Sequence, residues 1–141
     1  MPKQQHILRI TLPIPPSINE QYATVKGLRV STAIARHFKQ QVRLALTAME
    51  REGRLSTELR AHLRQSYLAL FLAFYFETPL KRDLDGGLKI TQDALCEGLG
   101  INDNRIVSIH LVKYIDPLHP HLDAELEALD DWQFDEEYTL L

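Results

Sequence analysis

The residues with the clearest chemical potential are two aspartates, Asp83 and Asp85, which stand two positions apart after an apolar segment. In an extended backbone, side chains at positions i and i+2 point to the same side, so both carboxylates face one way. Lys89 follows four residues after Asp85, and Asp103 lies in the polar turn that comes after the next predicted helix. A strand, a helix and a turn can therefore bring three carboxylates together at one end of a sheet.

Three carboxylates without a supporting His or Cys offer only oxygen ligands, which suit Mg²⁺ or Mn²⁺ and not zinc. Such sites hold one metal ion, or a pair about 3.5–4 Å apart, and orient water for phosphodiester cleavage. The ammonium group of Lys89 could neutralise charge on the phosphorane or on the leaving oxygen. Asp83, Asp85 and Asp103 are thus candidate metal ligands, and Lys89 is a candidate catalytic residue.

Each of these residues also has a purely structural interpretation. Asp83 or Asp85 could cap a helix, Asp103 could stabilise a turn, and Lys89 could be an exposed helix position. Taken singly, each structural role is favoured. The combination of D-x-D-x-x-x-K with a later acidic turn is more informative, but spacing alone leaves both interpretations open.

Length and composition predict one globular domain. The chain has 141 residues, of which 45% are hydrophobic and 25% charged, a balance that excludes disorder of the whole chain. The longest apolar run, Tyr67 to Phe76, has ten residues and is too short for a membrane-spanning helix. The N-terminal segment lacks the apolar stretch of a secretion signal, and the single cysteine, Cys96, cannot form an internal disulfide. We expect a cytoplasmic protein.

Charge is divided unevenly along the chain. The formal net charge is −3, but eight acids and no Lys or Arg lie from Asp123 onward, so the first 122 residues carry about +5. A basic body with an acidic tail is compatible with a polyanionic partner. The tail, residues 130–141, is interpreted either as a solvated terminus or as a competitor of nucleic acid for the basic surface. Its apolar residues, such as Trp132 and Phe134, suggest that part of it docks.

Hydrophobic periodicity predicts an α+β fold: a single domain with a small mixed β-sheet and helices packed on it, in the order β(β)α(α)βαββ. The predicted strands are residues 6–12, 28–30, 67–76, 106–114 and 122–129, and the predicted helices are 32–52, 56–64 and 87–99. Residues 17–22 are expected to form a polar loop. The strand 67–76 is expected to be buried on both faces.

The helix 32–52 and several histidine, cysteine and phenylalanine residues have both a structural and a functional interpretation. In the helix 32–52, Ile34, Phe38, Val42, Ala45 and Met49 form the expected buried stripe, and Arg36, Lys39 and Arg43 form a basic row opposite it. That row is either a solvated face or a surface for a phosphate backbone. His119 and His121 are expected in an exposed turn, and Cys96 as a structural thiol. Phe71, Phe74 and Phe76 are expected in the core.

Residues 81–107 resemble the core motif of the RusA-type Holliday junction resolvases. The chain offers Arg82-Asp83-Leu84-Asp85, Lys89, Asp93-Ala94-Leu95 and the turn Asn102-Asp103-Asn104-Arg105 before Ile106-Val107. Near the N-terminus, Leu12-Pro13-Ile14-Pro15-Pro16-Ser17-Ile18-Asn19 is similar to the strand of that family followed by Pro-Pro-Ser-x-Asn. The resemblance extends to about residue 129, which predicts a nuclease domain over 1–129 and a separate acidic tail.

This resemblance implies a Mg²⁺-dependent homodimer, bacterial or phage-encoded, in which Mn²⁺ substitutes, that binds four-way DNA junctions and nicks two opposing strands symmetrically. No membrane association or nucleotide cofactor is implied. Asp83, Asp85 and Asp103 fall on the metal-binding acids of the family and Lys89 on its essential lysine. The expected DNA contacts are Arg82, Lys81, Asn19 and Arg105, together with the basic row of Arg36, Lys39 and Arg43.

The chain also departs from the family pattern. Gly86 replaces a common Asn, Asn102 replaces one acid of a pair, and Arg105 replaces a Gln. Two alternatives to junction resolution therefore stay open. One is a nuclease for branched DNA in general, and the other is a junction-binding protein without catalysis.

Overall fold

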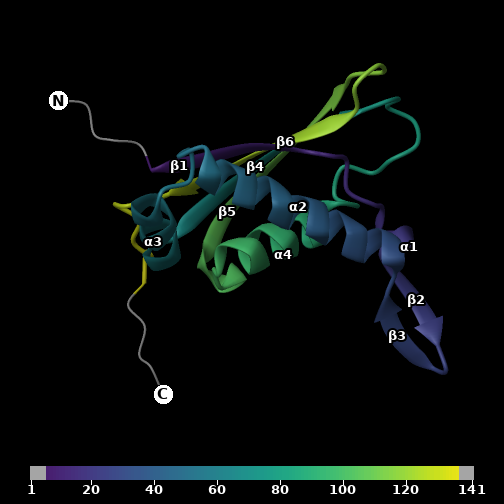
Figure 1. The fold of residues 1–141 in the computed structure, drawn as a ribbon, viewed down its shortest axis with the longest axis horizontal. Coiled ribbons are helices and arrows are strands. Elements are labelled where there is room, and N and C mark those ends of the chain that lie inside the picture. Colours follow the sequence, from purple (N-terminus) through teal and green to yellow (C-terminus); the bar gives the residue numbers. More distant parts are fainter. Residues whose placement is uncertain (1–5, 137–141) are drawn as a thin grey trace.

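The computed structural model describes residues 6–136, which form an α+β fold (Figure 1). The elements are β1 (Ile7–Leu12), α1 (Ile18–Gln21), β2 (Tyr22–Val25), β3 (Leu28–Ser31), α2 (Ala33–Arg51), α3 (Thr57–Gln65), β4 (Leu68–Phe76), α4 (Leu88–Leu99), the 3₁₀ helix η1 (Asp103–Arg105), β5 (Ile106–Ile115) and β6 (His121–Ala128). The predicted fold class, a mixed sheet with helices packed on it, is confirmed. In the described residues, no helix is both long and apolar enough to cross a membrane.

Four strands form the main sheet in the order β1-β6-β4-β5. Strands β4 and β5 are parallel, while β6 is antiparallel to both β1 and β4. Parallel strands need a long crossover connection, which α4 provides. The loop 77–87 therefore leaves the carboxyl end of β4, whereas η1 lies where β5 begins, beside the amino end of β4.

The core lies between the sheet and the two long helices, α2 and α4, which run side by side across one face of the sheet (Figure 1). The predicted bounds of α2 are confirmed, and Thr32 caps the helix by accepting a hydrogen bond from the amide of Ala35. The predicted buried stripe was wrong at its first position, because Ile34 is 55% exposed and the adjacent Ala35 is buried instead. Leu46 is buried where the sequence favoured Ala45.

The prediction that strand 67–76 is buried on both faces was wrong. Alternate residues of β4 are buried, and those between them are half-buried or exposed. Phe71, expected in the core, is 42% exposed and stacks on His110 of β5 with ring centroids 4.4 Å apart. Strand β5 is an edge strand without a fully buried residue. The sheet thus has one covered face and one open face.

Residues 17–22 do not form the predicted loop. They form the single turn α1 and enter β2, which pairs with β3 in a hairpin that projects from the body of the protein (Figure 1). The hairpin turns at Lys26 and Gly27, which both have positive φ, as two-residue turns of this type require. The side chains of β2 are all exposed, so β2 lacks the alternating buried pattern by which a strand is predicted.

Candidate active site

Asp83 and Asp85 lie on the loop that connects β4 to α4, and both are exposed. Leu84 between them is half-buried against the core. The extended backbone expected for this pair was wrong, because residues 84–87 form a turn in which the amide of Gly86 donates to the carbonyl oxygen of Asp83 at 3.3 Å. A shared face for the two carboxylates stays a prediction. Helix α4 has Gly87 at its N-cap and no side-chain capping bond, which excludes a capping role for either aspartate. Among the described residues, neither carboxylate has a hydrogen-bond or ion-pair partner. Both are therefore available to a ligand.

Hydrogen bonds from two side chains connect the proline-rich segment before α1 to this loop. Gln21, only 2% exposed, donates hydrogen bonds from Nε2 to the carbonyl oxygens of Pro16 and Gly86, each at 3.0 Å. Arg82 donates from Nη2 to the carbonyl oxygen of Pro15 at 2.8 Å. Moving the two backbone segments apart would break a hydrogen bond and leave the buried amide without a partner, which costs free energy. The amide of Gln21 therefore holds the two segments at a fixed distance. Gln21 is a positioning residue that the sequence did not reveal.

Strand β5 holds the start of the same loop. Lys113 donates from Nζ to the carbonyl oxygens of Arg82, at 2.7 Å, and Pro79, at 3.1 Å. The guanidinium of Arg82 lies 5.5 Å from the ring of Phe76, and its partial burial lowers its pKa. The Nε atom of Arg82 is buried without a partner among the described residues. Arg82, predicted as a DNA contact, therefore already has a structural contact to the proline segment.

Lys89, in the first turn of α4, contacts two acids. Its Nζ lies 2.8 Å from Oδ1 of Asp93, one helical turn away, and 3.4 Å from Oδ2 of Asp103. The hydrogen bond to Asp93 is the main cause that raises the pKa of Lys89. The ammonium group thus stays protonated at neutral pH. Lys89 and Asp93 thus form an i, i+4 ion pair on the surface of α4.

Asp103 opens η1, and its neighbour Asn102 performs the turn-stabilising role. The Asn102 side chain accepts a hydrogen bond from the amide of Asn104 at 3.1 Å. The carboxylate of Asp103 is left free for Lys89. Asp83 and Asp85 precede α4, and Asp103 follows it. Lys89, near the start of this helix, contacts Asp103 and so connects the segment after the helix to the first turn of α4.

The three predicted acids have the donor chemistry for a hard divalent ion, since they offer carboxylate oxygens at or near the surface. They do not form a tight cluster. Within residues 6–136, the one group of three metal-ligating side chains whose ligand atoms all lie within 4.8 Å is His6, His62 and Asp130. A common ion for Asp83, Asp85 and Asp103 stays a prediction.

Arg105 lies in a groove at the start of β5, with its Cζ atom 5.3 Å from the ring of Tyr67. The groove has a volume of about 980 Å³, and its other lining residues include Arg64, Asn102 and Asn104. The tail also lines it: Phe134 packs edge-on against Tyr67 with ring centroids 5.1 Å apart. Docking of this part of the tail is confirmed; residues 137–141 lie outside the described residues.

The remaining predicted DNA contacts lie on three separate elements. Arg36 donates to the carbonyl oxygen of Ser31, Lys39 pairs with Glu97 of α4 at 3.0 Å, and Arg43 is exposed on α2. Asn19 is exposed on α1, and Lys81 is exposed on the loop beside Asp83. The structure places Asn19 and Lys81 on the two segments that Gln21 and Arg82 hold together.

Sequence reasoning missed the cluster of His6, His62 and Asp130. His62 and Asp130 are 68 positions apart in the chain, and His6 and Asp130 are 124 apart, so no local spacing signals their contact. His119 and His121 are the only histidines close together in the sequence, two positions apart, and they were expected in an exposed turn. In the structure His121 stacks on Tyr75 and lies near Asp116 and Asp123.

A comparison with known protein families completes the description of the site. The family model described as endodeoxyribonuclease RusA matches residues 13–127. That range contains all four predicted active-site residues and ends before the acidic tail. No curated protein matches the chain.

Proposed function

Because the chain belongs to the RusA family of endodeoxyribonucleases, we propose that this endonuclease resolves four-way DNA junctions by paired, symmetric nicks that depend on Mg²⁺. The observation that carries the proposal is the family match over residues 13–127, which contains the acids and the lysine of the predicted motif. The carboxylates of Asp83 and Asp85 support it, because they are exposed and have no partner within residues 6–136, which leaves two ligands for an ion.

In this proposal Asp83, Asp85 and Asp103 hold the ion, with Mn²⁺ as a possible substitute. The ion supplies Lewis-acid activation and charge neutralisation at the scissile phosphate. Lys89 contributes a permanent positive charge, because its contact with Asp93 raises its pKa and keeps it protonated. Asp93 acts as a positioning residue that directs the ammonium along α4. Gln21 and Arg82 hold the loop that carries the two aspartates against the proline segment.

Paired nicks require two active sites on one junction. One chain carries one D-x-D loop, so symmetric cleavage implies a homodimer with one loop on each opposing strand. The basic groups of the groove at Arg64 and Arg105, together with Lys81 beside the loop, are the proposed contacts to phosphates. Their interaction with DNA is expected to weaken as the salt concentration rises.

The test is cleavage of an end-labelled four-way junction beside linear duplex of the same sequence, with Mg²⁺ or EDTA. Asp83→Asn should abolish nicking while junction binding persists, and Lys89→Ala should slow nicking by about 10²–10³-fold, the usual effect of removing one transition-state contact. Glu127→Gln is the matched control, because Glu127 is exposed on β6 near the opposite end of the sheet from the loop. This control should cleave as the wild type does.

Each alternative function gives a different result in this assay. Nicks of equal rate on forks, flaps and junctions would indicate a nuclease for branched DNA in general. Tight binding of the junction without product in Mg²⁺ or Mn²⁺ would indicate a binding protein. Full cleavage by Asp83→Asn would contradict the proposed site.

A further inference from the structure

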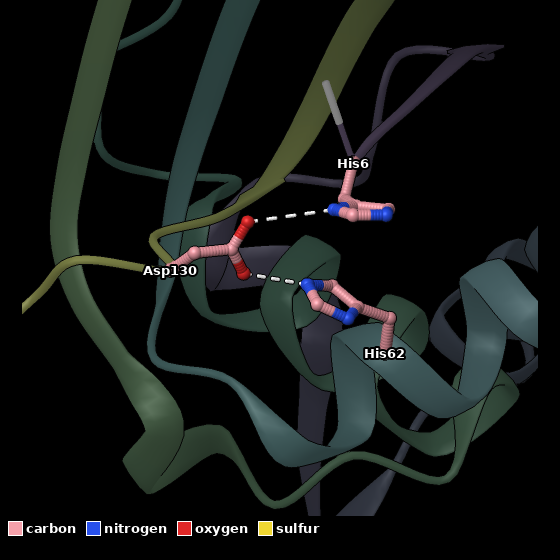
Figure 2. A group of neighbouring side chains, drawn as sticks. All are labelled: His6, His62 and Asp130. Carbon is pink, nitrogen blue, oxygen red and sulfur yellow. Dashed lines mark hydrogen bonds and ion pairs between the residues drawn. The ribbon is translucent and has the colours of Figure 1, made fainter. Parts of the chain in front are cut away.

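We propose that His6, His62 and Asp130 form a second metal site, which binds one divalent transition-metal ion of the Zn²⁺ class. The three side chains come from the residue before β1, from α3 and from the residues after β6 (Figure 2). Both imidazole rings turn a nitrogen toward the carboxylate of Asp130 (Figure 2). Nε2 of His62 lies 2.5 Å from Oδ1 of Asp130, and Nδ1 of His6 lies 3.4 Å from its Oδ2.

The geometry places three ligand atoms around one point. One ligand atom from each residue lies within 4.8 Å of the other two. A zinc ion with bonds of about 2.0–2.2 Å to nitrogen and oxygen needs its ligand atoms roughly 3.3 Å apart, so small side-chain rotations close the site. The two rings already lie side by side, with centroids 3.7 Å apart and planes tilted by 31°. Two neutral imidazoles beside one carboxylate can share an ion, whereas two imidazolium charges at that distance would repel each other.

The donor set decides the class of ion. Two imidazole nitrogens and one carboxylate oxygen suit Zn²⁺ and its neighbours in the first transition row, and they suit Mg²⁺ poorly because Mg²⁺ prefers oxygen. All three side chains are between 32% and 44% exposed, which leaves a path for the ion and a position for water.

This second site is distinct from the candidate active site. His6 and Asp130 lie at the end of the sheet where β6 residue Ala128 pairs with Leu68, the first residue of β4. Asp83 and Asp85 follow the last residue of β4, Phe76. A strand of nine residues spans roughly 30 Å, so the length of β4 separates His6 and Asp130 from Asp83 and Asp85. Asp103, at the start of β5, is not a member of the cluster. A bound ion would fasten the start of β1, helix α3 and the base of the acidic tail to one another.

The test is titration of the full-length protein with Zn²⁺ alone, measured by calorimetry and by the melting temperature. The wild type should bind one Zn²⁺ at this site and melt at a higher temperature when the ion is present. His62→Gln and Asp130→Asn should each weaken this binding by at least about tenfold and remove the rise in melting temperature. His37→Gln is the matched control, because His37 is exposed on α2 and away from the cluster.

The variant Asp83→Asn separates this inference from the proposed function. Zn²⁺ binding that persists in Asp83→Asn and is lost in His62→Gln supports the second site, whatever the cleavage assay shows. Binding that is lost in Asp83→Asn and kept in His62→Gln would assign the ion to the candidate active site and overturn the inference. The ring-proton NMR signals of His6 and His62 in the wild type give a check that needs no variant: Zn²⁺ must shift both, and unshifted signals would also overturn it.

Discussion

The two adjacent glycines that precede α4 should differ in their response to alanine, which should destabilise the protein at Gly87 and leave it almost unchanged at Gly86. Gly87 is buried between the proline segment and β4, and a Cβ atom there would lie 2.5 Å from Cγ of Pro15 and 3.5 Å from Cε1 of Phe74. Gly86 has open surroundings, because a Cβ atom there would lie 3.6 Å from the carbonyl oxygen of Asp83, an ordinary contact. Gly87 has a φ of −107°, so alanine at that position tests packing alone and adds no backbone strain.

The neighbours of Gly87 cannot easily move away. Pro15 is buried and rigid, its carbonyl oxygen accepts a hydrogen bond from Arg82, and Phe74 is fully buried. Overpacking of this kind costs about 1–3 kcal/mol. In a chain of this length, 1 kcal/mol corresponds to about 3–4 °C in melting temperature, so Gly87→Ala should melt about 3–10 °C lower. Gly86→Ala should melt within about 2 °C of the wild type, since alanine there reduces only the freedom of the unfolded chain.

The assay combines thermal unfolding with junction cleavage. Because Gly87 lies two residues after Asp85, displacement of Pro15 should also move the loop, and Gly87→Ala should cleave more slowly at temperatures where it is still folded. Gly86→Ala is the control for a change of glycine in the same loop. Equal melting temperatures and equal cleavage rates for Gly87→Ala and the wild type would refute the packing argument.

Two further predictions concern the tail and the cysteine. Deletion of residues 134–141 removes three acids, changes the formal net charge from −3 to 0 and uncovers the groove at Arg64 and Arg105. Junction binding should tighten at low salt and the gain should shrink at high salt, whereas unchanged affinity across a salt series would retire the idea of competition. Burial raises the pKa of the Cys96 thiol to about 11, so only about one thiol in a thousand is ionised at pH 8. Alkylation at pH 8 should be slow in the native protein, faster as the pH approaches 11 and at least about tenfold faster in denaturant; equal native and denatured rates would contradict this burial.

Local patterns in the sequence predicted much of the frame that carries the site. The caps at Thr32 and Ser56 and the glycine at position 53 mark the ends of α2 and α3, because capping and helix termination depend on residues close in the chain. The i, i+4 spacing of Lys89 and Asp93 likewise places their side chains on one face of α4, where the structure pairs them. In these cases helix geometry alone fixes which side chains are neighbours. The i, i+2 spacing of Asp83 and Asp85 is less informative, because these residues lie in a turn and not in an extended strand.

Burial in the sheet was not predictable in this way. Phe71 and the buried Leu72 both lie within the same apolar run of the sequence. Phe71, however, lies on the face of β4 that the described helices leave uncovered. Whether a face of a strand is covered depends on where the helices pack. Strand β2 escaped prediction for a related reason, since all its side chains are exposed and it has no apolar face that would reveal its periodicity. Its partner β3 was predicted, as residues 28–30.

The sequence by itself determined the chemistry that this protein can perform: carboxylates and a lysine at the spacing of the RusA family, on a basic body with an acidic tail. Tertiary structure alone decided which groups far apart in the chain meet. It placed Asp103 beside Lys89, held the D-x-D loop with Gln21 and Lys113, and brought His6, His62 and Asp130 together from three distant segments. The physical reason is that ligand atoms must come within a few ångströms, and for residues far apart in the chain that distance is set by the packing of the sheet and its helices.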